Sequence, residues 1–165
     1  MSCGFQLSSI EDDGSNNMKG YLQTLRDRVH SNWIDYNGHM NIMWYMNIFD
    51  RCSDILTQKF ELSGEDAPDN GITLVAGRIY IAHRKELVEN DEFEIWSGLA
   101  SISDRGFTIS HRAVKNGRIH ATCDINANAF SRNSRKSIRL EPGVLKIAEA
   151  YIIPGMKDRF ANEAL

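Results

Sequence analysis

The sequence predicts an α+β domain in which one curved antiparallel sheet of about five strands wraps around one long central helix. From Ile42 to Leu56, apolar residues recur at alternating steps of three and four, which is the stripe of a helix packed on a large surface. From Ile72 to Phe130 the period changes to two, as in half-buried antiparallel strands. The longest alternating runs exceed the usual strand length, which indicates a strongly curved sheet.

The predicted elements follow one another in a simple order. A strand pattern leads into a polar turn before the helix, and residues 63–71 after the helix are dense in turn formers and predict a loop. Asn116-Gly117, between two alternating runs, is the strongest hairpin signal, because a type I′ turn needs positive φ at both central residues. A short apolar helical pattern over residues 144–152 closes the chain.

A chain of 165 residues suits one domain with one core, and we assign residues 21–165 to that domain. Residues 1–20 contain no arginine and no apolar stretch, and acidic residues lie in their middle. Neither a secretory signal nor a transit peptide has that composition. We expect these residues to form a flexible N-terminal tail.

Charge and cysteine content narrow the expected environment. The formal net charge of −3, with both signs mixed, makes neither nucleic acid nor a membrane surface an expected partner. No run approaches the roughly 18 apolar residues that span a bilayer, so a soluble protein is predicted. Three cysteines without CxxC spacing argue against a disulfide framework or a thiolate zinc site, and they favour a reducing compartment. We therefore expect the cytoplasm.

The most informative stretch in the chain is Asp35-Tyr36-Asn37-Gly38-His39-Met40-Asn41. It sets one carboxylate three residues before a glycine and then opens onto the predicted helix. The unpaired N–H groups of that helix's first turn are expected near Asp35. A carboxylate beside such donors can orient a carbonyl group and attack it.

Together with Tyr45, this stretch resembles the D-x-x-G-H-[VM]-N motif of hotdog-fold acyl-CoA thioesterases of the 4-hydroxybenzoyl-CoA thioesterase type. The segment from Tyr80 to Glu92 is similar to the family's second strand and the turn after it, and the likeness covers Thr24 to Arg132. The form WIDYNGHM looks closest to the subgroup that hydrolyses betainyl-CoA-like thioesters. The resemblance implies a hotdog fold and hydrolysis of a small acyl-CoA to free acid and CoA. It also implies a homodimer or homotetramer with sites at the subunit boundary, and no cofactor is expected.

The motif supplies four candidate catalytic residues. Asp35 is the candidate general base or nucleophile, with both routes open, and its structural alternative is to cap or stabilise the turn. The backbone N–H of Ile42 is the candidate oxyanion donor at the positive end of the helix dipole. His39 can polarise a carbonyl, move a proton or bond to backbone, and Asn41 can orient substrate or fix the turn. His30 and His39 have no carboxylates at metal-ligand spacing, so no metal site is expected.

Two basic clusters are candidates for binding the CoA phosphates, which suit charge-assisted contacts with arginine. Solvated surface loops are the structural alternative. The first cluster contains Arg132, Arg135 and Lys136, and the second contains His83, Arg84 and Lys85. Four aromatic residues near the motif are candidates for the acyl pocket and for a cage around a quaternary ammonium group, with core packing as the alternative: Trp33, Tyr36, Trp44 and Tyr45.

Two other functions stay open. A hotdog-type hydratase or dehydratase acting on an acyl thioester pairs a histidine near the helix start with a carboxylate on the helix, and His39 with Asp54 could imitate that pair. The prolines that follow the histidine in that family are missing here, and Asp35 would be unexplained. A non-catalytic acyl-thioester binding module is the second alternative, because an intact carboxylate does not prove turnover. The absence of a GxSxG elbow and of a glycine-rich phosphate loop excludes serine hydrolases and P-loop proteins.

Overall fold

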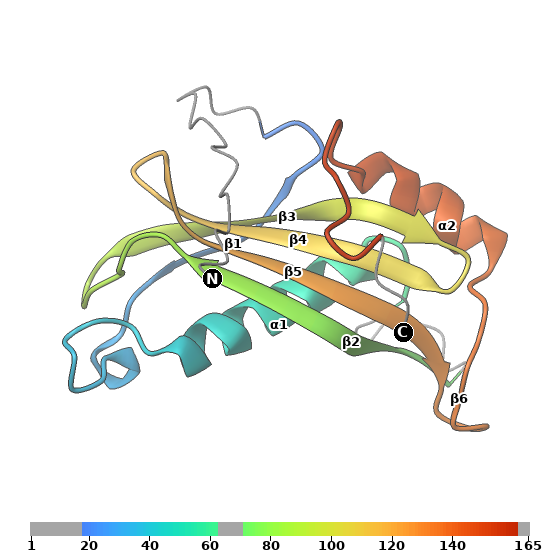
Figure 1. Ribbon diagram of the computed structural model, residues 1–165, viewed down its shortest axis with the longest axis horizontal. Helices are drawn as coiled ribbons and strands as arrows, with labels where there is room; N and C mark the ends of the chain where they lie inside the picture. Colours follow the sequence, from blue (N-terminus) through green and yellow to red (C-terminus); the bar gives the residue numbers. More distant parts are fainter. Residues whose placement is uncertain (1–17, 63–70, 162–165) are drawn as a thin grey trace, which may run out of the picture.

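Six antiparallel strands form one twisted sheet in the computed structural model, which describes residues 18–62 and 71–161. The strand order is β1-β3-β4-β5-β2, and β6 pairs with the end of β5 (Figure 1). The prediction of about five strands is corrected by β6, which is too short to show a period in the sequence. The strands are β1 Leu22–Arg28, β2 Ile72–His83, β3 Glu92–Ser103, β4 Gly106–Lys115, β5 Arg118–Ser131 and β6 Lys136–Ser137.

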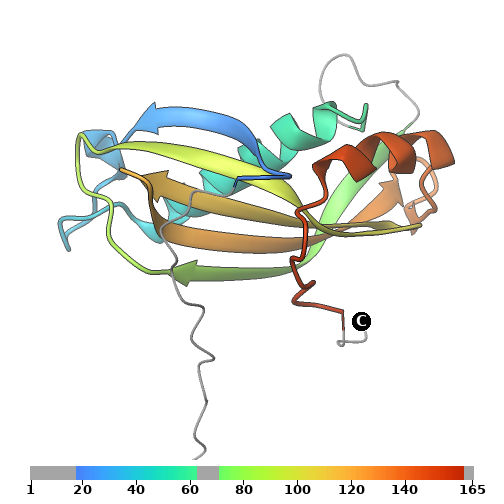
Figure 2. The ribbon, with the colours of Figure 1, turned by 90° about the horizontal axis from the view of Figure 1, so that it is seen from above.

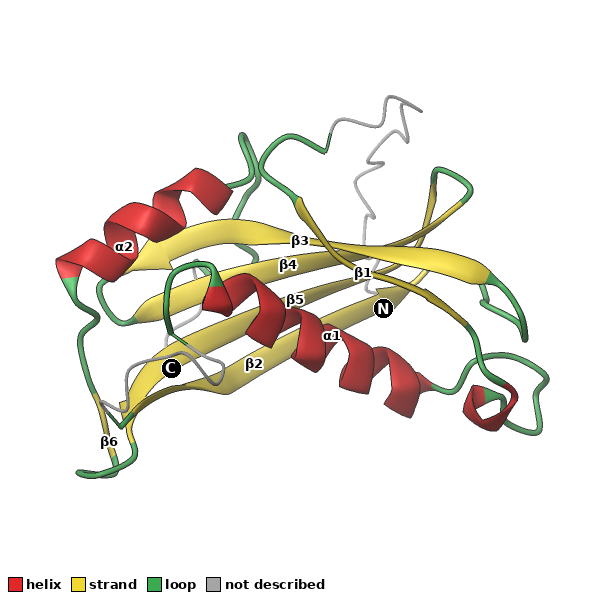
Figure 3. Ribbon diagram, turned by 180° about the vertical axis from the view of Figure 1, so that it is seen from behind, coloured by secondary structure: helices red, strands yellow, loops and turns green. Residues whose placement is uncertain are grey.

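Helix α1 (Ile42–Gln58) lies across one face of the sheet, and the chain that follows α2 (Pro142–Ala148) crosses the other face (Figures 2 and 3). The sequence predicted one long central helix wrapped by the sheet, and the structure does not show this wrapping. Helix α1 has 17 residues, and its outer side, which carries Asn47 and Asp50, stays exposed in the described chain. The sheet therefore covers one side of α1 rather than enclosing it.

The remaining short helices are η1 (Ser31–Trp33) and η2 (Glu149–Tyr151), and η2 continues directly from α2. The predicted C-terminal helix is thus present with an earlier start. No helix in the part of the chain that the structure describes is long and apolar enough to cross a membrane. Residues 1–17 of the predicted N-terminal tail and residues 63–70 of the predicted loop lie outside the described residues. A cytoplasmic location stays a prediction.

The hairpin between β4 and β5 confirms the turn predicted at Asn116-Gly117. Asn116 has φ of 50° and Gly117 has φ of 72°, and the flanking residues Lys115 and Arg118 are paired. Both central residues have the positive φ that a type I′ turn requires. This turn fixes the register of β4 and β5 at the end of the sheet that also carries the start of α1.

The core lies between α1 and the inner face of the sheet. Residues at period two on β4 and β5 point inward, as predicted, and Phe107, Ile109, Cys123 and Ile125 are buried there. On α1 the predicted stripe supplies buried residues one turn apart, among them Phe49. The two periods thus meet in one apolar layer, and this layer holds the helix on the sheet.

A buried polar chain crosses this apolar layer at His111. The Nε2 atom of His111 lies 2.9 Å from the Ser53 Oγ atom on α1, and Nδ1 lies 2.7 Å from the Ser97 Oγ atom on β3. The Ser97 Oγ atom in turn lies 2.8 Å from the Thr24 Oγ1 atom on β1. The side chain of His111 is fully buried, so both ring nitrogens must be satisfied inside the protein. The chain therefore sets the position of α1 along the sheet.

Acid should weaken the fold through His111. Burial lowers the pKa of His111 to about 3, against 6.5 for an exposed histidine, so the unfolded state binds the proton more tightly. The stabilisation is complete above pH 6.5 and is lost as the pH falls from 6.5 toward 3. We expect the free energy of unfolding to drop by about 2 to 3 kcal/mol between pH 7.5 and 4.5 from this residue.

Urea unfolding across this pH range measures that loss. His111→Gln should flatten the dependence on pH, whereas the control His30→Gln, at an exposed position, should keep it. An equally steep acid loss in His111→Gln would show that another group causes it.

The cap of α1 is the second testable feature of the fold. The Asn41 Oδ1 atom accepts a hydrogen bond from the Met43 backbone N–H at 2.9 Å, which satisfies one of the unpaired donors of the first turn. We expect Asn41→Ala to lower the free energy of unfolding by about 1 kcal/mol. Asn47→Ala, on the exposed side of α1, should be neutral or slightly stabilising because alanine favours helices. Equal losses in both variants, measured by chemical denaturation, would contradict the capping role.

Candidate active site

A tight turn before α1 holds the candidate carboxylate. The Gly38 N–H donates to the Asp35 carbonyl oxygen at 3.0 Å, and the Asp35 N–H donates to the His39 carbonyl oxygen at 3.2 Å. Gly38 has φ of 82°, a conformation that residues with a Cβ atom rarely adopt. Ile34 and Met40 form a bridge at the base of the turn, so its two ends stay together.

Both oxygens of the Asp35 carboxylate accept hydrogen bonds from this segment. Oδ1 accepts from the Asn37 backbone N–H at 2.8 Å, and Oδ2 accepts from the Asn41 side-chain amide at 2.9 Å. These two donors, with the Asn37 N–H as the larger influence, lower the pKa of Asp35. Asp35 is thus an anion at neutral pH, and its oxygens keep lone pairs for a further partner. Its structural role in the turn is present, and its catalytic role stays a prediction.

The first turn of α1 leaves one backbone donor free. The Met43 N–H donates to the Asn41 side chain, and the Trp44 N–H donates to the Asn41 carbonyl oxygen at 3.0 Å. The Ile42 N–H precedes both, and it has no acceptor within residues 18–62 and 71–161. A free N–H at the positive end of a helix suits a developing oxyanion.

A pocket of about 350 Å³ lies beside this first turn. It brings together six of the residues that the sequence named as candidates, and it adds Met40 and Glu86, to which the sequence gave no role at the site. Burial raises the pKa of Tyr45 to about 12 and lowers the pKa of His83, so both rings are largely neutral at pH 7. The lining residues are His39, Met40, Ile42, Tyr45, His83, Arg84, Lys85 and Glu86.

His39 links the turn to this pocket. Its ring is half-buried, and Nδ1 lies 3.4 Å from the Met40 carbonyl oxygen, a contact that suits the structural alternative for this residue. A charge on His39 also lowers the pKa of both Asp35 and His83. No group of three His, Cys, Asp or Glu side chains in the described ranges is arranged to hold a metal ion.

Within one chain the four predicted aromatic residues are not gathered around one pocket, and their role in an acyl pocket stays a prediction. The rings of Trp33 and Trp44 stack 5.2 Å apart, and Trp33 also packs on Phe93 in the core. Tyr36 is 97% exposed at the tip of the turn. Only Tyr45 lines the pocket, where its ring meets His83 edge to face at 4.7 Å. Among these residues there is no aromatic cage for a quaternary ammonium group.

The predicted phosphate-binding residues are also separated within one chain. Arg84 lines the pocket, but Arg132, Arg135 and Lys136 lie beyond the other end of β5. On β5, Ala121 pairs with His83 and Ser131 pairs with Ile72, so roughly 30 Å of strand separates the two clusters. The guanidinium of Arg135 lies over the Phe130 ring instead. One CoA molecule held at the pocket can meet this far cluster only from a second copy of the chain.

Comparison with known proteins identifies solved structures of the same fold. A hypothetical protein of Staphylococcus aureus, SAV2348, solved in complex with CoA, is similar with a TM-score of 0.73 and 18% identity over 79% of this chain and 84% of that chain. The DHNA-CoA thioesterase of Staphylococcus aureus is similar with a TM-score of 0.67 and 16% identity over 77% of this chain and 86% of that chain. These likenesses show a shared hotdog fold.

None of the curated proteins compared with this chain matches it. Residues 29–147, however, match the family described as the thioesterase-like superfamily. The match begins directly after β1, and it includes the turn at Asp35, helix α1, the four long strands β2 to β5 and the short β6. This chain therefore belongs to the thioesterase-like superfamily.

Proposed function

We propose that this protein hydrolyses a small acyl-CoA thioester to the free acid and CoA. One observation carries the proposal: Asn41 bonds both to the ionised Asp35 carboxylate and to the first turn of α1, where the Ile42 N–H is free. A carboxylate and an oxyanion donor are thus held at fixed positions in one segment, and Ile42 of this segment lines the pocket, whereas Asp35 is not among the lining residues. These are the two groups that thioester hydrolysis requires, because thiolate is already a good leaving group.

Two routes fit this arrangement. As a general base, Asp35 removes a proton from water while the oxygen of that water attacks the thioester carbonyl carbon. As a nucleophile, Asp35 attacks the carbon itself and forms an anhydride that water then hydrolyses. In both routes the carbonyl oxygen becomes negative and accepts a hydrogen bond from the Ile42 N–H. The C–S bond then breaks, and the CoA thiolate takes up a proton.

The hydratase alternative finds no support in the geometry. Asp54 lies twelve residues along α1 from Ile42, which corresponds to about 18 Å of helix, and its side chain is exposed. His39, by contrast, lies at the turn before the helix. The two side chains therefore cannot act on the same bond within one chain.

The lining of the pocket bears on the acyl group. A volume of about 350 Å³ suits a small acyl group with part of the pantetheine arm, which fits the 4-hydroxybenzoyl-CoA type of substrate. A cationic betainyl group would meet two cations, Arg84 and Lys85, against one carboxylate, Glu86, and the lining supplies no aromatic cage to compensate. We therefore propose a small acyl group without positive charge in place of the betainyl class.

The first prediction from this proposal concerns Asp35. Asp35→Asn keeps the shape of the side chain but can neither accept the proton nor attack well, so thioester hydrolysis should fall by roughly a hundredfold or more. Thiol release from a panel of acyl-CoAs measures this loss, and thermal unfolding checks that the variant is folded. Asp50→Asn, the same substitution on the exposed side of α1, should keep normal turnover.

Near-normal turnover in folded Asp35→Asn would overturn the role of Asp35. No thiol release by the unmodified protein from any acyl-CoA of the panel would favour the non-catalytic binding module instead.

The second prediction is that the protein forms at least a dimer. Strand β2 is a 12-residue edge that pairs only with β5 in the described chain, and it exposes Val75 and Ile79. Such an edge invites pairing with another strand, and a second copy would cover it symmetrically. Light scattering at micromolar concentration should show at least twice the chain mass, and Val75→Lys with Ile79→Lys should shift it toward monomer. A monomer in the unmodified protein would refute the prediction.

A further inference from the structure

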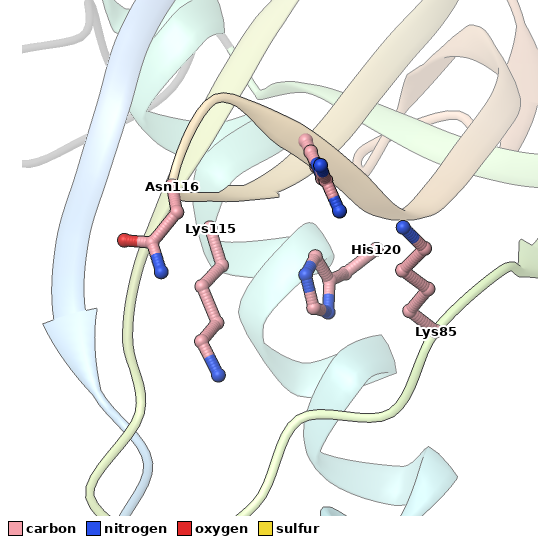
Figure 4. A pocket seen from close by; sticks show the side chains of 5 residues that line it. Lys85, Lys115, Asn116 and His120 are labelled. Carbon is pink, nitrogen blue, oxygen red and sulfur yellow. The ribbon is translucent and has the colours of Figure 1, made fainter.

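A second pocket lies beside the candidate site, at the end of the β4–β5 hairpin. It has a volume of about 410 Å³, and it is lined by three cationic side chains, one amide and one imidazole. Figure 4 shows His120 between Lys115 and Lys85, which come from different segments of the chain. No carboxylate lines it, in contrast to the first pocket. The lining residues are Lys85, Lys115, Asn116, Arg118 and His120.

The walls of this basic pocket are joined by backbone and side-chain hydrogen bonds. The Arg84 and Lys85 N–H groups both donate to the His120 carbonyl oxygen, at 2.8 and 3.1 Å. The His120 Nδ1 atom lies 2.9 Å from the Glu86 carbonyl oxygen, which can only accept, so Nδ1 carries a proton. The segment that carries Lys85 is thus fixed to the first residues of β5, and the pocket is preformed.

Two of the three cations in this pocket lack an anionic partner. The Lys115 Nζ atom lies 2.6 Å from the Asp91 Oδ1 atom, so its charge is already matched. Lys85 and Arg118 make no ion pair with any residue of the described ranges. Two unmatched positive charges beside one hollow attract a multiply charged anion, and arginine binds phosphate through two parallel hydrogen bonds.

Lys85 also lines the first pocket, so the two pockets share a wall. A CoA thioester carries its reacting carbonyl at one end of a long pantetheine arm and its phosphates at the other. We propose that the basic pocket binds phosphate groups of the CoA moiety through Arg118 and Lys85 of the same chain. The identity of the ligand rests on the proposed function, whereas the site itself rests on the pocket and its unmatched charges.

Binding of desulfo-CoA, which cannot form a thioester, tests this site directly by calorimetry. Arg118→Ala leaves the lining of the first pocket intact and should raise Kd. The double variant Arg118→Ala with Lys85→Ala should raise Kd by about tenfold or more. Arg118→Lys with Lys85→Arg keeps both charges and should bind more tightly than the alanine pair. Arg105→Ala with Lys146→Ala removes the same charge from exposed positions outside the pocket and should leave Kd unchanged.

Truncated ligands identify which phosphate is bound. If the unmodified protein and the alanine variants have the same Kd for dephospho-CoA, the site binds the 3′-phosphate. If their Kd values still differ for dephospho-CoA but are the same for pantetheine, the site binds the diphosphate. Either result supports the site. The site would be overturned if the double variant Arg118→Ala with Lys85→Ala weakened the binding of pantetheine as much as that of desulfo-CoA. It would also be overturned if this variant folded and kept its Kd for desulfo-CoA, or if the unmodified protein did not bind desulfo-CoA. A loss of desulfo-CoA binding seen only in Arg132→Ala with Arg135→Ala would also overturn the site. That result would place the phosphates at the far cluster of a second copy.

The two proposals can fail separately. If desulfo-CoA binds through Arg118 and Lys85 but no acyl-CoA releases thiol, hydrolysis is refuted and the phosphate site stands. If thiol is released but the alanine variants keep their Kd for desulfo-CoA, the phosphate site is refuted and hydrolysis stands.

Discussion

The side chain of Asn41 is the connection on which the candidate site depends. Its amide nitrogen donates to Asp35, and its amide oxygen accepts from the Met43 N–H. One planar group therefore ties the direction of the carboxylate to the direction of the helix axis. Because the cap occupies the second N–H of α1 and not the first, the Ile42 N–H stays available. A structural cap and a candidate oxyanion site thus follow from the same two hydrogen bonds.

The position of this helix start is in turn set by the core. The buried chain from Ser53 through His111 and Ser97 to Thr24 crosses from α1 to three strands, so a shift of α1 along the sheet would break it. Buried polar groups cost free energy when they lose their partners, which makes such a chain specific for one arrangement. Apolar packing alone tolerates sliding more readily. The polar chain therefore fixes α1 lengthwise while Phe49 and its neighbours hold it against the sheet.

Positive charge gathers at both ends of the sheet, and the two ends have different surroundings. At the end with α1, Arg84, Lys85 and Arg118 lie around two pockets that share a wall. At the other end, Arg139 pairs with Asp104, and Arg135 lies over an aromatic ring. Unmatched cations beside a hollow favour a bound anion, whereas matched or stacked cations are already stabilised. This contrast supports the phosphate site that we propose within one chain, at the end of the sheet with α1.

The sequence by itself determined the parts of this protein that depend on near neighbours. The periods of three to four and of two predicted α1 and the five long strands, and Asn116-Gly117 predicted the hairpin turn. The Asp35 to Asn41 segment predicted a carboxylate beside a helix start, because those contacts span at most six residues. The two-residue β6 carried no signal, since so short a strand has no period.

Only the tertiary structure decided which distant residues meet. Trp33, Tyr36 and Trp44 lie close to Tyr45 in the sequence, yet one pair stacks in the core and Tyr36 faces solvent, because a turn and a helix send neighbouring side chains in different directions. Arg132 and Arg84 are basic alike, but the length of β5 places them at opposite ends of the sheet. Conversely, strand register brings Lys85 beside His120 and the β4–β5 turn. The local sequence pattern does not predict such pairings, because they form only when strands far apart in the chain align.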